Sequence, residues 1–242
     1  MRRPPVNDHE RVLDFAENLK RKNYISMIMK EEIINWYIEK ASKLVIEALK
    51  KNGFNAYFVR SKEEALNKVL ELVPEGAKIG IGGSTTIREL KIADVLAEKG
   101  YKVFRHDIPG LSPEEQFRMR REELLTDVFL ASANAITLDG KIVNMDGTGN
   151  RVAAMAFGPK KVILVAGVNK VVKDLESAIW RIKNVVAPMN AKRLKRNVPC
   201  VENGFCSECD MPDRICNVLL ILEKKPSLTE YHIILVGEEL GF

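Results

Sequence analysis

The chain has 242 residues, of which 46% are hydrophobic, 7% aromatic and 29% charged. A chain of this length and composition buries one substantial core and is neither collagen-like, low-complexity nor mainly disordered. The 38 Lys and Arg residues exceed the 33 Asp and Glu residues by five, and the excess is spread along the whole chain. A mild, dispersed positive charge does not indicate nucleic-acid binding, and we expect no nucleic-acid partner.

Two features predict a cytoplasmic protein. The longest apolar stretches, such as residues 162–168 and 218–222, are far shorter than the roughly 20 residues that a membrane-spanning helix needs. The first ten residues are charged and lack the apolar core and small-residue cleavage site of a secretory signal. We therefore expect no membrane partner.

The first half of the chain alternates helices and strands. Apolar residues at three- and four-residue spacing predict a helix through the first fifty residues, which Asn52-Gly53 stops. The pattern then predicts a strand over residues 54–59, a helix opened by a capping box at Ser61, a strand over residues 77–81 and a helix that closes at Gly100.

The second half continues the alternation and adds a hairpin. Strands are predicted over residues 101–104 and 127–131, on either side of a helix that a capping box opens at Ser112. Asp139-Gly140 predicts a two-residue hairpin turn with both residues at positive φ. The remaining predictions are a central strand over residues 162–168, an amphipathic helix over 174–186, a basic helix or turn over 188–196, and a final strand pair formed by 215–222 and 231–236.

This order of elements predicts an α/β fold with an open, largely parallel sheet, helices on both faces and one antiparallel hairpin in the middle of the sheet. No clean linker interrupts the chain. We expect a helical N-terminal extension over residues 1–52 that packs on the domain. The α/β domain itself is predicted over residues 53–242 and includes a cysteine-bearing loop over residues 198–216.

All the cysteines of the chain lie in a 17-residue window, as Cys200, Cys206, Cys209 and Cys216. Four thiolates can hold zinc or an iron–sulfur cluster, and a C-x2-C pair presents two sulfurs to one ion. The complete spacing, C-x5-C-x2-C-x6-C, matches neither a standard zinc ribbon nor a ferredoxin pattern. Two disulfides and four reduced thiols are therefore the alternatives to a metal centre.

A small polar loop lies between a predicted buried strand and the start of a helix. Free backbone N–H groups at such a position favour a phosphate or carboxylate. Glycine permits close approach and the hydroxyls add donors, so we predict an anion site at Gly82, Gly83, Ser84, Thr85 and Thr86. The alternative is that Thr86 only caps the helix, with Glu89 completing a capping box.

A second loop has the composition of an active site. Ligands of open α/β sheets bind at strand ends such as this one. Asp146 is a candidate general base, Asn144 a group that orients a polar substrate, and Arg151 a partner for its anionic group. The intervening Gly147, Thr148, Gly149 and Asn150 complete the predicted site. The alternative is a capped turn with Arg151 on the surface.

The three histidines, His9, His106 and His232, are scattered along the sequence. His106 follows a predicted strand, where it could line a cleft. A lone histidine is more often structural, so we do not predict a catalytic role for it.

The glycine-serine-threonine loop, residues 125–151, residues 157–167 and the cysteine tail together resemble the LUD domain family. This family takes its name from lactate utilization proteins, whose bacterial B and C members belong to an iron–sulfur and flavin-associated L-lactate oxidation system. The chain looks like the single-domain branch with its own C-terminal cysteine cluster. It lacks the long ferredoxin-like extension of the B type.

The resemblance implies a fold similar to the sugar-phosphate isomerase and coenzyme A transferase (NagB/RpiA-like) group. In those relatives, loops at the positions of residues 82–86 and 144–151 surround a phosphorylated sugar or a coenzyme A thioester. The aspartate-rich isomerase signature is only partly matched by Asp146-Gly147, and no convincing transferase glutamate is present. The fold alone does not specify a reaction.

The leading hypothesis is a lactate-utilization-like protein that binds a small anionic metabolite between the two loops. The four cysteines would hold an iron–sulfur cluster or zinc for redox metabolism, with redox partner subunits and homo-oligomer formation as open options. One alternative is an isomerase- or coenzyme A transferase-like enzyme without a redox centre. The other is a non-catalytic subunit or a redox-responsive regulator.

Overall fold

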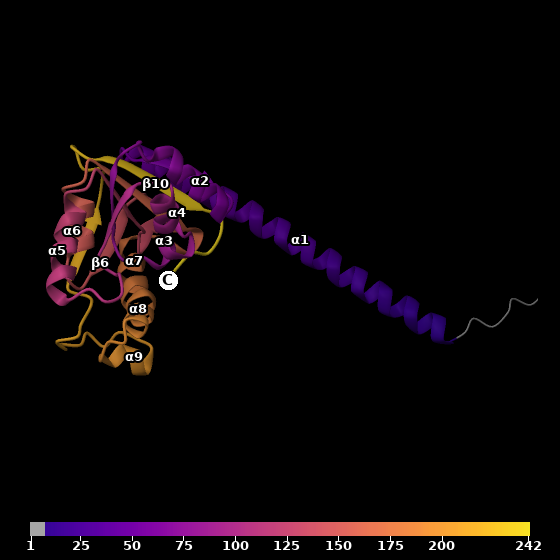
Figure 1. Ribbon diagram of the computed structural model, residues 1–242. Helices are drawn as coiled ribbons and strands as arrows, with labels where there is room; N and C mark the ends of the chain where they lie inside the picture. Colours follow the sequence, from indigo (N-terminus) through magenta and orange to yellow (C-terminus); the bar gives the residue numbers. More distant parts are fainter. Residues whose placement is uncertain (1–7) are drawn as a thin grey trace, which may run out of the picture. The chain divides into compact units, whose positions relative to one another are not determined.

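The computed structural model describes the backbone of residues 8–242 and the side chains of residues 29–242 (Figure 1). The chain divides into two compact units between Ala41 and Ser42. Helix α1 (Asp8–Lys51) confirms the predicted long helix over its described part, and its last turns belong to the larger unit. That the N-terminal extension packs on the domain stays a prediction, and residues 1–7 lie outside the described residues.

A six-stranded parallel sheet forms the centre of the larger unit. All its neighbouring strands pair in parallel, so their carboxyl ends lie along one edge. The strand order is β1 (Asn55–Val59), β10 (Glu230–Val236), β7 (Lys161–Gly167), β4 (Val128–Ala131), β2 (Lys78–Ile81) and β3 (Lys102–Arg105). The predicted open, largely parallel α/β sheet is confirmed.

Helices cover both faces of this sheet, as predicted. On one face, α2 (Lys62–Leu72), α3 (Thr85–Glu89) and α4 (Ile92–Glu98) bury apolar side chains against alternate residues of the strands. The opposite face buries the end of α1 and α6 (Asn150–Ala156), through side chains such as Leu49 and Met155. Helix α5 (Pro113–Leu124) contacts β2, β3 and α6, and its predicted capping box at Ser112 is present.

The predicted hairpin does not lie in the middle of the parallel sheet, so that prediction is wrong. Strands β5 (Ala135–Thr137) and β6 (Ile142–Asp146) belong to a second sheet with the order β8 (Val171–Val172), β5, β6, β9 (Val218–Leu222). Ile136 and Ile142 of the hairpin are buried in the same cluster as one face of the main sheet. A strand that is buried because its sheet packs on another sheet and a strand that is buried in the middle of one sheet show the same apolar pattern in a sequence.

The predicted final strand pair is also wrong. Strand β9 pairs antiparallel with β6, whereas β10 lies between β1 and β7 in the main sheet. The two strands are neighbours in the sequence, but local patterning carries no information about which strand each one joins.

Two predicted local features also differ. Of the two hairpin residues, only Gly140 has a positive φ, at +81°, because residues 138–141 separate β5 from β6 and the turn is longer than two residues. The helix predicted to run to Gly100 is broken into α3 and α4 by Lys91, whose φ is +51°.

The helix predicted over residues 174–186 continues beyond its predicted end. It begins as α7 (Leu175–Arg181), passes through a π-helical turn, η2 (Ile182–Val186), and becomes α8 (Ala187–Arg193). The predicted basic helix is thus the end of the same helical segment. The short helices η1 (Val168–Lys170) and α9 (Pro199–Asn203) complete the fold.

Within the described part of the chain, none of the helices has both the length and the apolar character needed to cross a bilayer.

Candidate functional site

A cavity of ≈ 610 Å³ lies at the carboxyl edge of the main sheet. Residues in the segments after four of its strands line the cavity: Gly83 after β2, His106 after β3, Ser132 after β4, and Lys170 in η1 after β7. Helix α8 and the segment between Cys209 and β9 provide further lining. Ligands of open α/β sheets bind at this edge, so the cavity is the candidate site.

The predicted glycine loop lies at this cavity. Gly83, Ser84, Thr85 and Thr86 all line it, whereas Gly82 does not. The alternative that Thr86 caps the helix is wrong: Ser84 is the N-cap of α3, and its hydroxyl accepts a hydrogen bond from the backbone N–H of Ile87 at 3.3 Å. Glu89 does not complete a capping box but accepts a bond from the backbone N–H of Gly241 at 3.1 Å.

The second predicted loop folds around Arg151. Its guanidinium donates to Asp146 Oδ1 at 2.9 Å and to Asn144 Oδ1 at 2.6 Å, and it also donates to backbone carbonyls and to Asn134. Asp146 Oδ2 accepts from the backbone N–H of Val152 at 3.0 Å. The structure therefore brings the three predicted catalytic residues together, and it ties both Asp146 oxygens to partners that position the start of α6.

The two predicted loops touch each other. A Cβ atom on Gly82 would lie 2.9 Å from Cγ of Arg151 and 2.8 Å from the ring of Phe129, so only glycine fits there without displacement. Gly147, Thr148 and Asn150 line the cavity, and Gly149 is the N-cap of α6 with a φ of +87°. The proposed roles of Asp146, Asn144 and Arg151 in catalysis stay predictions.

Lys170 is a site residue that sequence reasoning missed. Its side chain is buried at the cavity, and its amine donates to Thr86 Oγ1 at 2.9 Å and to Ser132 Oγ at 2.8 Å. Burial, with smaller contributions from Arg181 and Arg151, lowers the pKa of Lys170 from 10.5 to about 7. The available signal was the position of Lys170, which with Asn169 lies between the apolar residues 162–168 and Val171-Val172.

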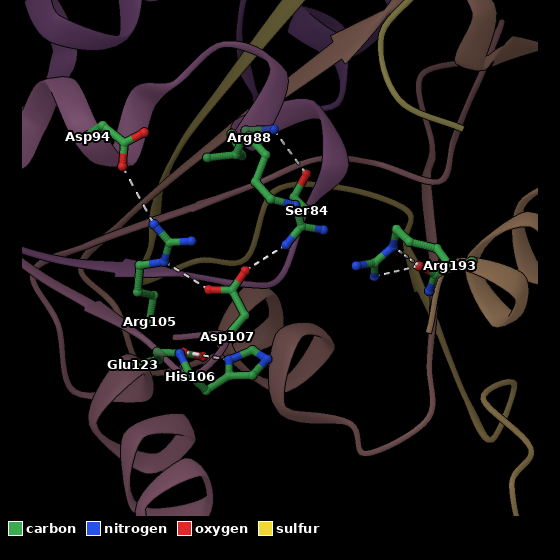
Figure 2. Close-up of polar contacts among 10 residues, drawn as sticks. Ser84, Arg88, Asp94, Arg105, His106, Asp107, Glu123 and Arg193 are labelled. Carbon is green, nitrogen blue, oxygen red and sulfur yellow. Dashed lines mark hydrogen bonds and ion pairs between the residues drawn. The ribbon is translucent and has the colours of Figure 1, made fainter. Parts of the chain in front are cut away.

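His106 lines the same cavity and is held by a buried carboxylate. Glu123 of α5 is 1% exposed, and its Oε1 lies 2.9 Å from the backbone nitrogen and 2.7 Å from Nδ1 of His106 (Figure 2). The sequence alone predicts no catalytic role for His106. Glu123 gave no signal in the sequence, because it follows other charged residues on a polar helix.

An arginine network extends along the cavity wall. Figure 2 shows Asp107 between Arg88 and Arg105, with ion-pair distances of 2.6 and 2.9 Å. Burial raises the pKa of Asp107, but the two arginines outweigh it and keep this pKa below its usual value. Two buried guanidinium nitrogens, Nη2 of Arg88 and Nε of Arg120, have no hydrogen-bond partner among the described residues.

Cationic residues outnumber acidic residues in the lining of the cavity. Besides Lys170 it contains six arginines, against three aspartates, Asp107, Asp146 and Asp213. The arginines are Arg88, Arg120, Arg151, Arg193, Arg196 and Arg214. Arginine forks match the geometry of carboxylates and phosphates, so this lining suits an anionic ligand.

The cysteine segment borders the cavity without placing its thiols on the lining. Arg214, which lines the cavity, donates to the carbonyl oxygens of Cys209 and Cys216 at 2.7 and 3.1 Å. All four thiols are free. Burial raises the pKa of Cys200, and the neighbouring Cys209 and Cys206 raise it further. The cysteines thus share one neighbourhood, although no group of three or more described His, Cys, Asp or Glu residues could hold a metal ion in this arrangement.

The chain combines a parallel α/β fold with a cavity at the carboxyl edge of its main sheet. The sequence pattern of the LUD domain matches residues 42–236. The chain therefore belongs to the LUD domain family. A comparison with curated proteins finds no match.

Among similar solved structures, that of a DUF162 family protein supports the fold. A DUF162 family protein from Deinococcus radiodurans is 15% identical, with a TM-score of 0.50 over 83% of this chain and 98% of that one. Ribose 5-phosphate isomerase A from Neisseria gonorrhoeae is 23% identical, with a TM-score of 0.32 over 47% of this chain and 54% of its own. The corresponding isomerase from Plasmodium falciparum is 20% identical, with a TM-score of 0.31 over 46% and 52%.

Proposed function

We propose that this protein binds a small anionic metabolite in the cavity at the carboxyl edge of its main sheet. The observation that carries the proposal is the excess of six arginines and Lys170 over three aspartates in the lining. Low-dielectric walls strengthen the attraction of such a lining for an anion. The partly unsatisfied guanidinium groups of Arg88 and Arg120 add donors that a carboxylate or phosphate can engage.

An isomerase- or coenzyme A transferase-like reaction without a redox centre is the second candidate. Lys170 favours it, because an amine with a pKa of about 7 exists in both protonation states near neutral pH. As an ammonium group it can stabilise negative charge on a ligand, and as a free amine it can accept a proton. Both forms serve chemistry at a bound carbonyl or ester group.

Redox metabolism with a cysteine-ligated iron–sulfur or zinc centre stays part of the proposal for the cysteine segment. Four thiols in one neighbourhood are the ligand type that such a centre needs. In the described structure, however, their arrangement does not form a group that could hold one ion. We therefore assign no reaction step to a metal. Redox partner subunits and a cytoplasmic location are proposed with this function.

Ligand-induced stabilisation tests the binding proposal. Lactate, sugar phosphates and acyl coenzyme A compounds are added separately, and the melting temperature is measured. A ligand at 100 times its dissociation constant should stabilise the protein by about 2.7 kcal/mol. Arg193→Ala should weaken the effect, because Arg193 lines the cavity and, among the described residues, its side chain donates hydrogen bonds only to Asn190 on its own helix.

Lys192→Ala is the matched control, because Lys192 is an exposed neighbour that does not line the cavity. Equal loss of stabilisation in both variants would show that only net charge matters. If no compound of the panel stabilises the protein, the binding proposal is contradicted, and the non-catalytic subunit or redox-responsive regulator becomes the better hypothesis.

A further inference from the structure

His106 and Glu123 form a hydrogen-bonded pair in which donor and acceptor can be assigned. The backbone N–H of His106 can only donate, so Glu123 Oε1 is an acceptor, and at 2.7 Å from Nδ1 it also accepts the imidazole hydrogen. Neutral His106 then carries its hydrogen on Nδ1 and a lone pair on Nε2. The buried carboxylate thus fixes both the tautomer and the orientation of the ring.

The free nitrogen of this imidazole faces the glycine loop. Nε2 of His106 would lie 3.5 Å from a Cβ atom built on Gly83, and both residues line the cavity. No described residue hydrogen-bonds to Nε2. An oriented imidazole with an open lone pair in a ligand cavity has the geometry of a general base.

A cationic group lies at the other end of the same loop. Lys170 donates two of its three ammonium hydrogens to Thr86 and Ser132, and among the described residues the third has no partner. Thr86 is three residues after Gly83, so the loop connects a base with a buried donor. A donor of this kind stabilises negative charge that develops on a carbonyl oxygen when a neighbouring carbon loses a proton.

We propose that His106, positioned by Glu123, takes a proton from a carbon next to a carbonyl group of the bound anion and returns it. This proposal rests on the proposed anion binding and names the ligand class, a carboxylate or phosphate that also carries a carbonyl group. Nε2 accepts the proton and the imidazole becomes an imidazolium. The C–H electron pair moves into the carbonyl group to give an enolate, and return of the proton completes a balanced cycle without a further reactant.

Hydrogen–deuterium exchange tests the step directly. The protein is incubated in D₂O with pyruvate, which has a carboxylate, or with dihydroxyacetone phosphate, which has a phosphate, and loss of the C–H signal is followed by proton NMR. We expect protein-dependent exchange with at least one probe. His106→Gln should reduce the exchange rate by about 100-fold or more, the usual contribution of a general base.

A second histidine–glutamate pair offers a matched control. His232 lies in β10, its Nε2 is 2.7 Å from Glu230, and it does not line the cavity. His232→Gln should therefore leave the exchange rate unchanged. Glu123→Gln should lower the rate by about tenfold or more while the dissociation constant of the probe stays within about threefold, because Glu123 acts only through His106. A purely structural role would change probe affinity and melting temperature together.

The outcomes separate the two proposals. If a probe stabilises the protein but undergoes no exchange, or exchanges equally fast with His106→Gln, the proton-transfer proposal is wrong and anion binding stands. If other anions bind but neither carbonyl probe does, the assigned ligand class is wrong. If no anion binds, both proposals fail. Nitrogen-15 NMR adds a test without ligand: an imidazole of His106 that is neutral with its hydrogen on Nε2 would overturn the proposal.

Discussion

Replacement of Lys170 by methionine tests how strongly a buried positive charge at the cavity destabilises the folded protein. The substitution keeps an unbranched side chain of similar length but removes the amine. In the protein, the Lys170 ammonium is buried and, among the described residues, donates hydrogen bonds only to the hydroxyls of Thr86 and Ser132. The wild-type chain therefore carries a desolvation cost whenever the folded protein holds this amine protonated.

The size of the effect follows from the pKa of Lys170, which falls from 10.5 to about 7 on folding. At about 1.4 kcal/mol per pKa unit, the charged amine disfavours the folded state by about 5 kcal/mol below pH 7. Between pH 7 and 10.5 the unfolded state binds more protons, so the stability contribution of Lys170 rises with pH. Loss of the two hydroxyl bonds in the variant costs about 1–3 kcal/mol.

Lys170→Met should therefore be more stable than the wild type at pH 6 and less stable at pH 10. The free energy of unfolding is measured in urea at both values, and the difference between the two proteins should change by about 4 kcal/mol. Lys173→Met is the control, because the Lys173 side chain is 83% exposed and its removal should have little pH dependence. If the unfolding free energies of the wild type and Lys170→Met differ by the same amount at pH 6 and pH 10, the assigned desolvation is refuted.

Three further predictions concern the loops. Gly82→Ala should destabilise the fold by about 1–3 kcal/mol, because the added methyl group would contact Phe129 and Arg151. Gly83→Ala is the control and should destabilise the fold less, because a methyl group there would make only ordinary contacts. Equal urea midpoints of the two variants would contradict the packing argument. Arg151→Met should cost about 3–5 kcal/mol, because it leaves the Asp146 carboxylate buried and unpaired, and adding Asp146→Asn should recover part of the loss in a double-mutant cycle. If the cysteine segment holds a metal, protein purified without oxygen should contain stoichiometric iron or zinc and Cys209→Ser should lose it; metal-free wild-type protein with four titratable thiols would reject this role.

The cavity shows which residues of a site can be predicted from the sequence. Residues 82–86 and 144–151 were predicted because small and polar residues follow apolar strands, and the structure brings both loops together at Gly82 and Arg151. Lys170 and Glu123 were missed. A charged residue on a helix or in a short turn looks the same in a sequence whether it is solvated or buried, and only its neighbours in the fold decide between the two.

The cysteine segment illustrates the same limit at longer range. Its four thiols are close in the sequence, and the spacing predicts that they share one region. The structure adds that this region borders the cavity through Arg214, which lines the cavity and binds carbonyl oxygens of the segment. No local pattern connects residue 214 to a loop at residue 146, because the connection depends on β9 pairing with β6.

The sequence by itself determined the family, the parallel α/β class and most element positions, since hydrophobic periodicity, capping residues and glycines act over a few residues. Tertiary structure alone decided that β5 and β6 form a second sheet, that β10 enters the main sheet, and that Lys170 and His106 reach one cavity. The physical reason is that strand pairing and the burial of charge depend on contacts between residues far apart in the chain. Those contacts set the dielectric environment and the hydrogen-bond partners, which in turn set the chemistry of the site.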